Sequence, residues 1–218
     1  MKIPNLSNSD LAYETGLHIG DGCLSQEKNK TYRFGYYGNN KDERKFFTQV
    51  IIPLMKKLYG FDLKLKKWEN TCFVRVCSKE LLCFKANVLG LPVGNKSAMR
   101  TLPKIFMNKE ELAKNLIAGL FDTDGSVYKN RNKYPRISLS LKNKSIIEEV
   151  QNYLNTLGIK SIITCNNYYD KRIRKRTVVW NIEINGFQRF YEFLKNIPLR
   201  NPKNLEKIKR LFGYSIIH

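Results

Sequence analysis

Apolar and polar residues alternate over several short stretches, which predicts β-strands with one buried face. These stretches are residues 31–37, 61–67 and 72–77 in the first half of the chain, and 135–141, 160–168 and 174–184 in the second. Elsewhere apolar residues recur three and four positions apart, the spacing of an amphipathic helix. Helices are therefore predicted at about residues 43–59, 79–89, 145–157, 186–195 and 203–213. Pro53 is expected to kink the first of these helices. Nearly the same order of elements is thus predicted twice.

A second repeat precedes each series of strands. Residues Ala12–Gly22 and Asn115–Gly125 share the form Gly-Leu-x-x-small-Asp-Gly, and the two copies are 103 residues apart. Small residues stand four positions apart in each copy, which places them on one face of a helix. Two helices with such faces can approach backbone to backbone, so we expect them to pack side by side and parallel. The small residues are Gly16 and Gly20 in the first copy, and Gly119 and Thr123 in the second.

Asp21 and Asp124 close the two copies, each followed by a glycine, Gly22 or Gly125. The glycines are expected to take the left-handed conformation that ends many helices. A carboxylate in the last turn opposes the helix dipole by ~0.3–1 kcal/mol, and two neighbouring carboxylates repel each other. A divalent cation would offset both costs, and two carboxylates with water and phosphate oxygens suit Mg²⁺. One Asp-Gly alone would be an ordinary turn signal; its repetition favours a shared site.

The two copies resemble the signature motifs of the LAGLIDADG homing endonucleases, in the monomeric form that carries both motifs on one chain. Ile117–Gly125 is the closer match, while Glu14–Gly22 departs from the family pattern at Glu14 and Ile19. The resemblance implies an α+β fold of two pseudo-symmetric αββαββα halves. Each half would hold a four-stranded antiparallel sheet, and two parallel motif helices would join the halves. The halves are expected at residues 1–108 and 109–218.

The resemblance also implies an activity. Such a protein is a site-specific, Mg²⁺-dependent nuclease of intron homing that cuts double-stranded DNA at a long asymmetric site. It cleaves across the minor groove and leaves short 3′ overhangs. Asp21 and Asp124, with Gly20 and Thr123 beside them, would hold Mg²⁺ at the scissile phosphates. Mn²⁺ or Ca²⁺ could occupy the same site.

Further catalytic residues are implied by the resemblance alone. A lysine near each centre would stabilise transition-state charge, and Lys96 and Lys203 match that position in the two halves. A polar residue after the first predicted strand of each half would organise water. Asn39 and Asn143 match it, in a register that is ambiguous by one residue in both halves.

Charge independently indicates a polyanionic partner. The 218 residues include 39 Lys and Arg against 19 Asp and Glu, which gives a net charge of +20 and favours nucleic acid. The polar faces of the predicted strands are cationic, and a β-sheet face can enter the major groove of DNA. A solvated sheet face is the alternative for any single residue. The residues expected to contact DNA are Arg33, Tyr37, Lys64, Lys66, Arg75, Arg136, Ser138, Ser140, Arg172, Arg174 and Arg176.

Other classes of protein are less compatible with the sequence. Five cysteines without a Cys-x-x-Cys pair argue against a zinc ribbon or a disulfide framework. His18 and His218 are the two histidines, which disfavours histidine-based hydrolases; His18 is expected to pack in its helix or face solvent. No signal peptide or membrane span is predicted. The expectation is a monomer that needs no protein partner and lies in the cytoplasm, with the nucleoid or in an organelle.

Three rival functions stay open at this stage. An intron RNA maturase and a DNA-binding protein without cleavage would keep the fold and the charge, but a pure binder does not need two clustered carboxylates. A basic ribosomal protein predicts no paired motif helices. The initial Met1 and the lack of recognisable splicing blocks disfavour an intein fragment.

Overall fold

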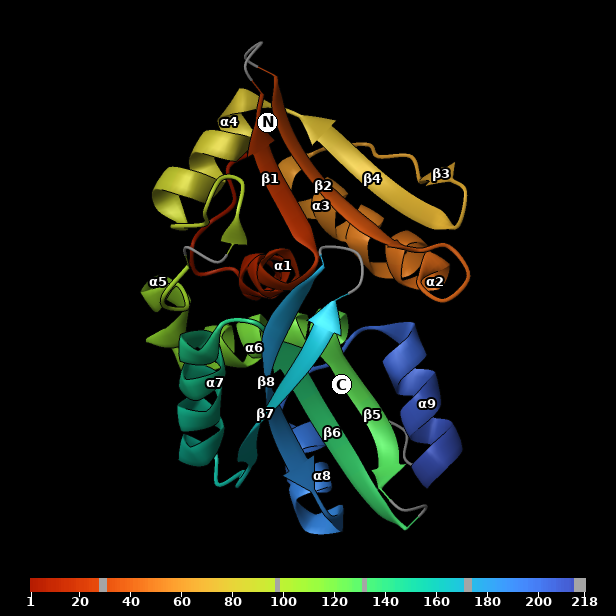
Figure 1. Cartoon of the computed structure of the whole chain (residues 1–218). Helices are drawn as coiled ribbons and strands as arrows, with labels where there is room; N and C mark the ends of the chain where they lie inside the picture. The colour runs from red at the N-terminus through yellow and green to blue at the C-terminus, as the bar shows by residue number, and fades with distance from the viewer. Residues whose placement is uncertain (28–30, 97–98, 131–132, 171–173, 214–218) are drawn as a thin grey trace.

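The computed structural model describes residues 1–27, 31–96, 99–130, 133–170 and 174–213. It consists of two similar halves, with helices α1 (Ser9–Gly20) and α6 (Glu110–Asp124) side by side between them (Figure 1). Each half holds a four-stranded antiparallel sheet, in the order β1-β2-β4-β3 or β5-β6-β8-β7. The predicted fold class is therefore confirmed.

In the N-terminal half, helices cover one face of the sheet. α4 packs on β2, and α3 packs on α1. The strands bury Phe34, Tyr36, Val74 and Val76 against these helices. After α1 the elements are β1 (Gly22–Gln26), β2 (Tyr32–Asn39), α2 (Arg44–Phe46), a π-helical stretch (Phe47–Ile51), α3 (Ile52–Tyr59), β3 (Lys66–Trp68), β4 (Thr71–Cys77), α4 (Lys79–Cys83), a second π-helical stretch (Phe84–Val88) and α5 (Lys104–Met107).

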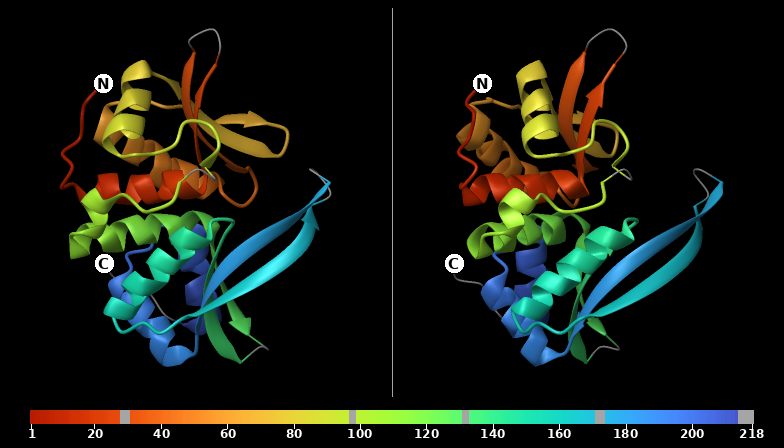
Figure 2. Two further views of the ribbon diagram at one scale, coloured as in Figure 1. Left: turned by 60° about the vertical axis from the view of Figure 1, so that its left-hand side comes forward. Right: turned by 90° about the vertical axis from the view of Figure 1, so that its left-hand side faces the viewer.

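The C-terminal half repeats this plan with one extension. α7 and α8 pack on β6 and β8, and the hairpin of β7 and β8 projects beyond the body of the molecule (Figure 2). After α6 the elements are β5 (Gly125–Asn130), β6 (Tyr134–Leu141), α7 (Lys144–Thr156), β7 (Ile162–Asp170), β8 (Lys175–Asn185), α8 (Phe187–Asn196) and α9 (Pro202–Phe212). The expected division after residue 108 falls between α5 and α6.

Strands β1 and β5 were not predicted, and they change the role of the motif glycines. Gly125 has φ −84° and ψ 157°, an extended conformation, and Gly22 begins β1 directly. The left-handed helix ends expected at both glycines are therefore wrong. Glycine is needed there for space, because an added Cβ at Gly125 would lie 2.2 Å from the Phe121 oxygen, and one at Gly22 would lie 2.6 Å from His18 Cα.

The predicted helix 43–59 is not one regular α-helix. A π-helical stretch over Phe47–Ile51 precedes α3, and Pro53 lies in the first turn of α3. The irregularity expected around Pro53 thus takes the form of a π-helical stretch directly before α3, one of the features that bend helices.

The core of the N-terminal half contains a fully buried ion pair. Lys85 Nζ donates to the two carboxylate oxygens of Glu14 at 2.6 and 2.8 Å. Tyr36 and Tyr59 donate their hydroxyls to the same carboxylate at 2.7 and 2.8 Å. Glu14 and Lys85 are both 0% exposed, so each charge depends on the other for compensation. The pairing with Lys85 gives Glu14 a structural role at a position where α6 has the apolar Ile117.

We expect Glu14→Ile to destabilise the protein by about 3–5 kcal/mol, because it leaves a buried Lys85 without its partner. The double variant Glu14→Ile/Lys85→Met should recover most of that loss, since no unpaired charge is left. Chemical denaturation of the wild type and both variants measures the difference. Equal destabilisation in the single and double variants would contradict a loss caused by the unpaired lysine.

Candidate functional site

The two motif helices touch backbone to backbone. An added Cβ at Gly16 would lie 2.0 Å from the carbonyl oxygen of Leu116, and one at Gly119 would lie 2.2 Å from a backbone oxygen of α1. One turn later, an added Cβ at Gly20 would lie 2.0 Å from Thr123 Oγ1. The contacts advance in the same direction along both helices. The predicted close, parallel packing is confirmed, and the C-terminal ends of α1 and α6 lie together.

These two ends bring the motif carboxylates to one place. Asp21 is the C-cap of α1, and Asp124 is the last residue of α6. Burial raises the pKa of Asp21 to about 6, with a further contribution from the charge of Glu43. Burial and then repulsion from Asp21 raise the pKa of Asp124 to about 7. The two carboxyl groups are therefore held close together in a place where burial and mutual repulsion disfavour their ionised forms.

The Lys96 ammonium group lies beside both carboxylates. Its Nζ donates to the Gly20 carbonyl and, at 3.4 Å, to the His18 carbonyl, so it caps the C-terminal end of α1. Burial lowers the pKa of Lys96, and attraction to Asp124 and Asp21 acts in the opposite direction. The structure therefore places the Lys96 ammonium group near the carboxylates of Asp21 and Asp124.

A cavity of about 1060 Å³ opens next to these groups, between the two halves. Asp124 and Gly20 contribute the helix ends, and the remaining walls come mainly from the segment around Lys96 and from the turn between β6 and α7. Basic side chains dominate its charged lining, which suits a phosphate backbone. They are Lys96, Arg100, Lys142 and Lys144.

Asn143 lines this cavity, but its side chain supports the local backbone. Its Oδ1 accepts from Ile146 N at 3.4 Å as the N-cap of α7, and its Nδ2 donates to the Met99 carbonyl. Asn39 likewise organises a turn, since its Oδ1 accepts from Lys41 N at 2.9 Å. Both side chains therefore stabilise local backbone, at the turn after β2 and at the start of α7.

Glu43 is a neighbour of the site that sequence reasoning missed. Its Oε2 accepts from Asn39 N at 2.6 Å, which folds the turn after β2 back toward the motif ends. Its charge raises the pKa of both Asp21 and Asp124. The available signal was the position of Glu43 four residues after Asn39, at the start of a predicted helix.

Lys203 is the lysine expected near the centre in the C-terminal half. Its side chain is exposed in the first turn of α9 and is not among the residues that line the central cavity. The end of α6 is instead capped by amides: Asn201 Nδ2 donates to the Asp122 carbonyl at 2.7 Å, and Asn204 Nδ2 to the Phe121 carbonyl at 3.5 Å. Neutral asparagines thus cap the last turn of the motif helix in this half, whereas the Lys96 ammonium group caps it in the other.

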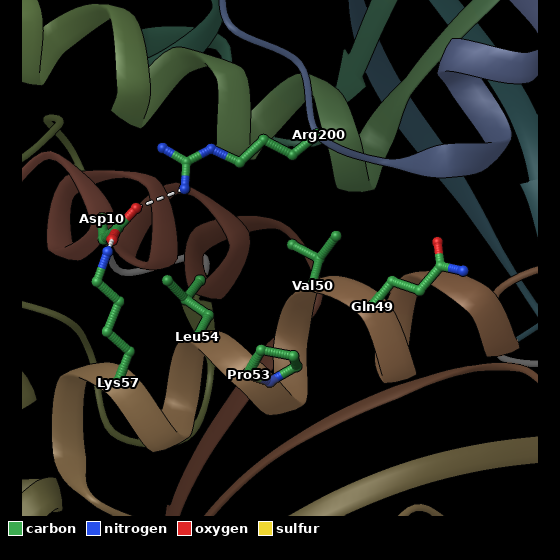
Figure 3. Close-up of a pocket in the computed structure, with 7 residues that line it drawn as sticks. All are labelled: Asp10, Gln49, Val50, Pro53, Leu54, Lys57 and Arg200. Carbon is green, nitrogen blue, oxygen red and sulfur yellow. Dashed lines mark hydrogen bonds and ion pairs between the residues drawn. The ribbon is translucent and has the colours of Figure 1, made fainter. Parts of the chain in front are cut away.

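Arg200 ties the two halves together on another side of the helix pair. Its guanidinium donates to Asp10 Oδ1 and to Asn115 Oδ1, both at 2.6 Å, and stacks over the Tyr13 ring at 4.1 Å. Tyr13 in turn donates its hydroxyl to Asp122 Oδ2 at 2.6 Å. Figure 3 shows Arg200 and Lys57 both reaching Asp10. These residues line a small pocket of about 250 Å³. This network holds α6 and the segment before α9 against α1.

His18 is 0% exposed and stacks on Phe34 with ring centroids 5.4 Å apart. Neither ring nitrogen has a hydrogen-bond partner among the described residues. Burial, followed by the charges of Lys85 and Lys96, lowers its pKa well below 6.5. Of the two placements expected for His18, packing in the helix is the one observed, and the equivalent position in α6 is Phe121.

We expect His18→Phe to stabilise the protein by about 1–3 kcal/mol, because it removes two buried polar atoms that lack partners. The gain should grow at acid pH. The folded protein keeps His18 neutral, whereas the unfolded chain protonates this histidine once the pH falls below about 6.5. The wild type therefore loses stability as the pH falls, and the phenylalanine variant does not. Melting temperatures of both proteins at pH 8 and pH 5 give the comparison. A variant less stable than the wild type at both pH values would mean that the ring nitrogens are satisfied.

The exposed face of the N-terminal sheet carries most of its predicted DNA contacts. Strand register places Tyr37, Phe73 and Lys66 in one row, and Arg75 in the next. Arg33 follows on the same face but pairs with Glu27. Lys64 is exposed in the irregular segment before β3.

The second sheet distributes its predicted contacts differently. Arg136, Ser138 and Ser140 alternate along β6 and share one face. Arg176 lies on the opposite face of β8, while Arg174 precedes the strand with φ 50°. Arg172 lies outside the described residues. Of the three arginines expected to contact DNA near this hairpin, Arg176 therefore does not share the face of Arg136.

Protein ligands for a metal are few. Within the described ranges, no group of three or more His, Cys, Asp or Glu residues gathers to hold an ion. Thr123 Oγ1 bonds to carbonyls of its own helix at 3.0 and 3.1 Å, and Gly20 O accepts from Lys96. Asp21 and Asp124 are thus the carboxylates available, as a site completed by water and phosphate oxygens requires.

None of the described helices is both long and apolar enough to cross a membrane.

Comparison with known proteins shows which proteins this chain is similar to. The LAGLIDADG-like domain matches residues 111–198. The homing endonuclease I-DmoI of Desulfurococcus mucosus is 28% identical over 170 residues, which cover 72% of this chain and 75% of that protein. The ATP-dependent DNA helicase Hel308 of Methanocaldococcus jannaschii is 29% identical over 224 residues, 95% of this chain, although the chain spans 17% of the helicase.

A solved structure shows the same similarity. The crystal structure of I-DmoI in complex with DNA and Mn superposes with a TM-score of 0.62 at 25% identity, and the match covers 88% of this chain and 97% of that one. The paired Asp-Gly motifs, the two sheets and these likenesses agree. In sequence and in fold, the chain is therefore similar to the LAGLIDADG homing endonucleases.

Proposed function

We propose that this protein is a site-specific endonuclease that binds double-stranded DNA as a monomer and cuts both strands of a long asymmetric site. The observation that carries the proposal is the meeting of Asp21, Asp124 and Lys96 beside a basic cavity between the two halves. A pure binding protein gains nothing from two half-buried carboxylates that repel each other, whereas a nuclease uses them. I-DmoI, solved with DNA and Mn, supports the same substrate.

Asp21 and Asp124 are the residues that would hold a divalent cation. Their raised pKa values fit this role, because a cation offsets the burial and repulsion that disfavour their charge. The I-DmoI complexes with Mg, Mn and Ca support divalent metals as a class, and we propose Mg²⁺ as the working ion. When bound, such an ion lowers the pKa of a water molecule and stabilises phosphoryl charge.

The chain's own residues bind and orient the DNA. Lys96 places a positive charge at the helix ends, where a scissile phosphate would develop negative charge. Arg100, Lys142 and Lys144 would hold the flanking backbone. The exposed sheet faces would lie in the major groove on either side, so the cut would fall across the minor groove and leave short 3′ overhangs. Asn39, Asn143 and Glu43 would position the loops around the centre.

We expect cleavage of a randomised double-stranded DNA library in Mg²⁺ to enrich one long asymmetric site among the cut ends, with none enriched in EDTA. Sequencing the ends gives the site and the overhang in one measurement. Binding to one site without cutting in any divalent metal would favour a DNA-binding protein. Binding to a structured intron RNA with no DNA selectivity would favour a maturase. Either result would overturn the proposal.

A further inference from the structure

The two sheets share one strand register, so their residues can be compared position by position. β1 begins with Gly22 opposite Tyr36, and β5 begins with Gly125 opposite Leu139. The next row on the exposed face is Cys23, Gly35 and Arg75 in the first sheet. In the second sheet it is Ser126, Ser138 and Glu183. Arg75 and Glu183 are therefore structural equivalents with opposite charge.

Arg75 is held in place by neutral neighbours. Its Nε and Nη2 both donate to the Tyr37 hydroxyl, at 3.3 and 3.0 Å. Its guanidinium also lies 5.4 Å from the Phe73 ring centre, and Phe73 stacks on Tyr37 at 5.7 Å. Gly35, directly opposite, has no side chain to cover it.

This arrangement leaves one edge of the guanidinium for a ligand. Because Nε and Nη2 share the Tyr37 oxygen, the edge formed by Nη1 and the second hydrogen of Nη2 points away from it. Within the described part of the chain, Arg75 forms no ion pair, and Glu27, whose charge also acts on Arg75, pairs with Arg33. Two parallel donors on a fixed, charged plane match the O6 and N7 acceptors of guanine in the major groove.

The equivalent row of the second sheet is neutralised internally. Arg136 Nη1 pairs with Glu183 Oε2 at 3.0 Å, and Arg136 Nε donates to Asn185 Oδ1. The hydroxyls of Ser126 and Ser138 bond to each other at 2.8 Å. The arginine of this face is therefore engaged by a carboxylate, unlike Arg75.

We propose that Arg75 reads a guanine in the half-site under the N-terminal sheet, and that the C-terminal half-site has no matching guanine preference at the symmetric position. This inference rests on the proposed function, since it concerns bases within the same target. It gives a physical origin for asymmetry in the DNA target. The row that presents the Arg75 donors in the first sheet holds Glu183 in the second, where the charge is neutralised by Arg136.

Binding selection tests the inference without relying on cleavage. The protein selects from a randomised double-stranded library in Ca²⁺, and base preference is determined at each position for the wild type, Arg75→Ala, Arg75→Lys and Tyr37→Phe. Arg136→Ala is the matched control in the other sheet. For the wild type we expect one guanine favoured by roughly 5- to 150-fold, the discrimination of a good bidentate contact.

Arg75→Ala should remove that preference and leave the rest of the site unchanged. Arg75→Lys should retain affinity but relax the preference, because a lysine lacks the planar pair of donors. Tyr37→Phe should weaken the preference in part, and Arg136→Ala should leave that guanine intact. Equal loss of affinity across all sequences in Arg75→Ala would show a phosphate contact and overturn the inference, as would an unchanged guanine. A wild type that selects no site would refute the proposed function itself.

Discussion

Gly119→Val and Gly16→Val are each expected to lower both the melting temperature and the rate of DNA cleavage. An added Cβ at either position would lie 2.0–2.2 Å from a backbone oxygen of the facing helix, far inside contact distance. The two helices must therefore move apart. Overpacking of this kind costs ~1–3 kcal/mol. It also shifts Asp21 relative to Asp124, and a displacement of about 1 Å can cost ~10²-fold in rate.

Gly60→Val separates these two effects. Gly60 has φ 77° at the end of α3, so valine strains the backbone there without touching the helix pair. It should lower the melting temperature but spare the specific activity of the folded protein. The measurements are thermal denaturation and single-turnover cleavage of the selected site. Full activity and wild-type stability in Gly16→Val and Gly119→Val would show that the motif helices do not form the interface.

The double variant Asp21→Asn/Asp124→Asn is expected to gain stability at neutral pH while it loses cleavage. Both carboxyl pKa values are raised, so the two groups favour the folded state below pH 3.8. That contribution is lost as the pH rises through about 6 for Asp21 and about 7 for Asp124. In EDTA, the wild type should therefore lose stability relative to the variant between pH 5 and pH 8.

Asp62→Asn is the matched control, because Asp62 is 84% exposed and pairs with Lys56 at the surface. Its stability should follow that of the wild type across the same pH range. Parallel curves for the wild type and the double variant would contradict the burial and repulsion inferred at the helix ends.

The repeated motif made the centre of this molecule predictable from sequence. Gly16 and Gly119 carry the packing signal in their own spacing, and Asp21 and Asp124 follow at fixed positions in each copy. The predicted strands around Val74 and Ile137 also formed, because alternation is a local property of the chain.

Features that depend on distant residues were not predictable in this way. Arg200 meets Asp10 across 190 positions, and no local pattern marks that pair. β1 and β5 are short and begin with the motif glycine, so they show little alternation. Lys203 matched in order along the chain, but the caps of α6 come from neighbouring asparagines, which tertiary packing selects.

The most direct test of the shared centre is strand cleavage of the selected site by the wild type, Asp21→Asn and Asp124→Asn in Mg²⁺, with binding measured on the same DNA. The account predicts that the wild type cuts both strands. Each variant should bind within a few-fold of the wild type yet lose double-strand cleavage, because groove and phosphate contacts lie elsewhere. Double-strand cleavage at the wild-type rate by either variant would remove that aspartate from the centre and contradict the account.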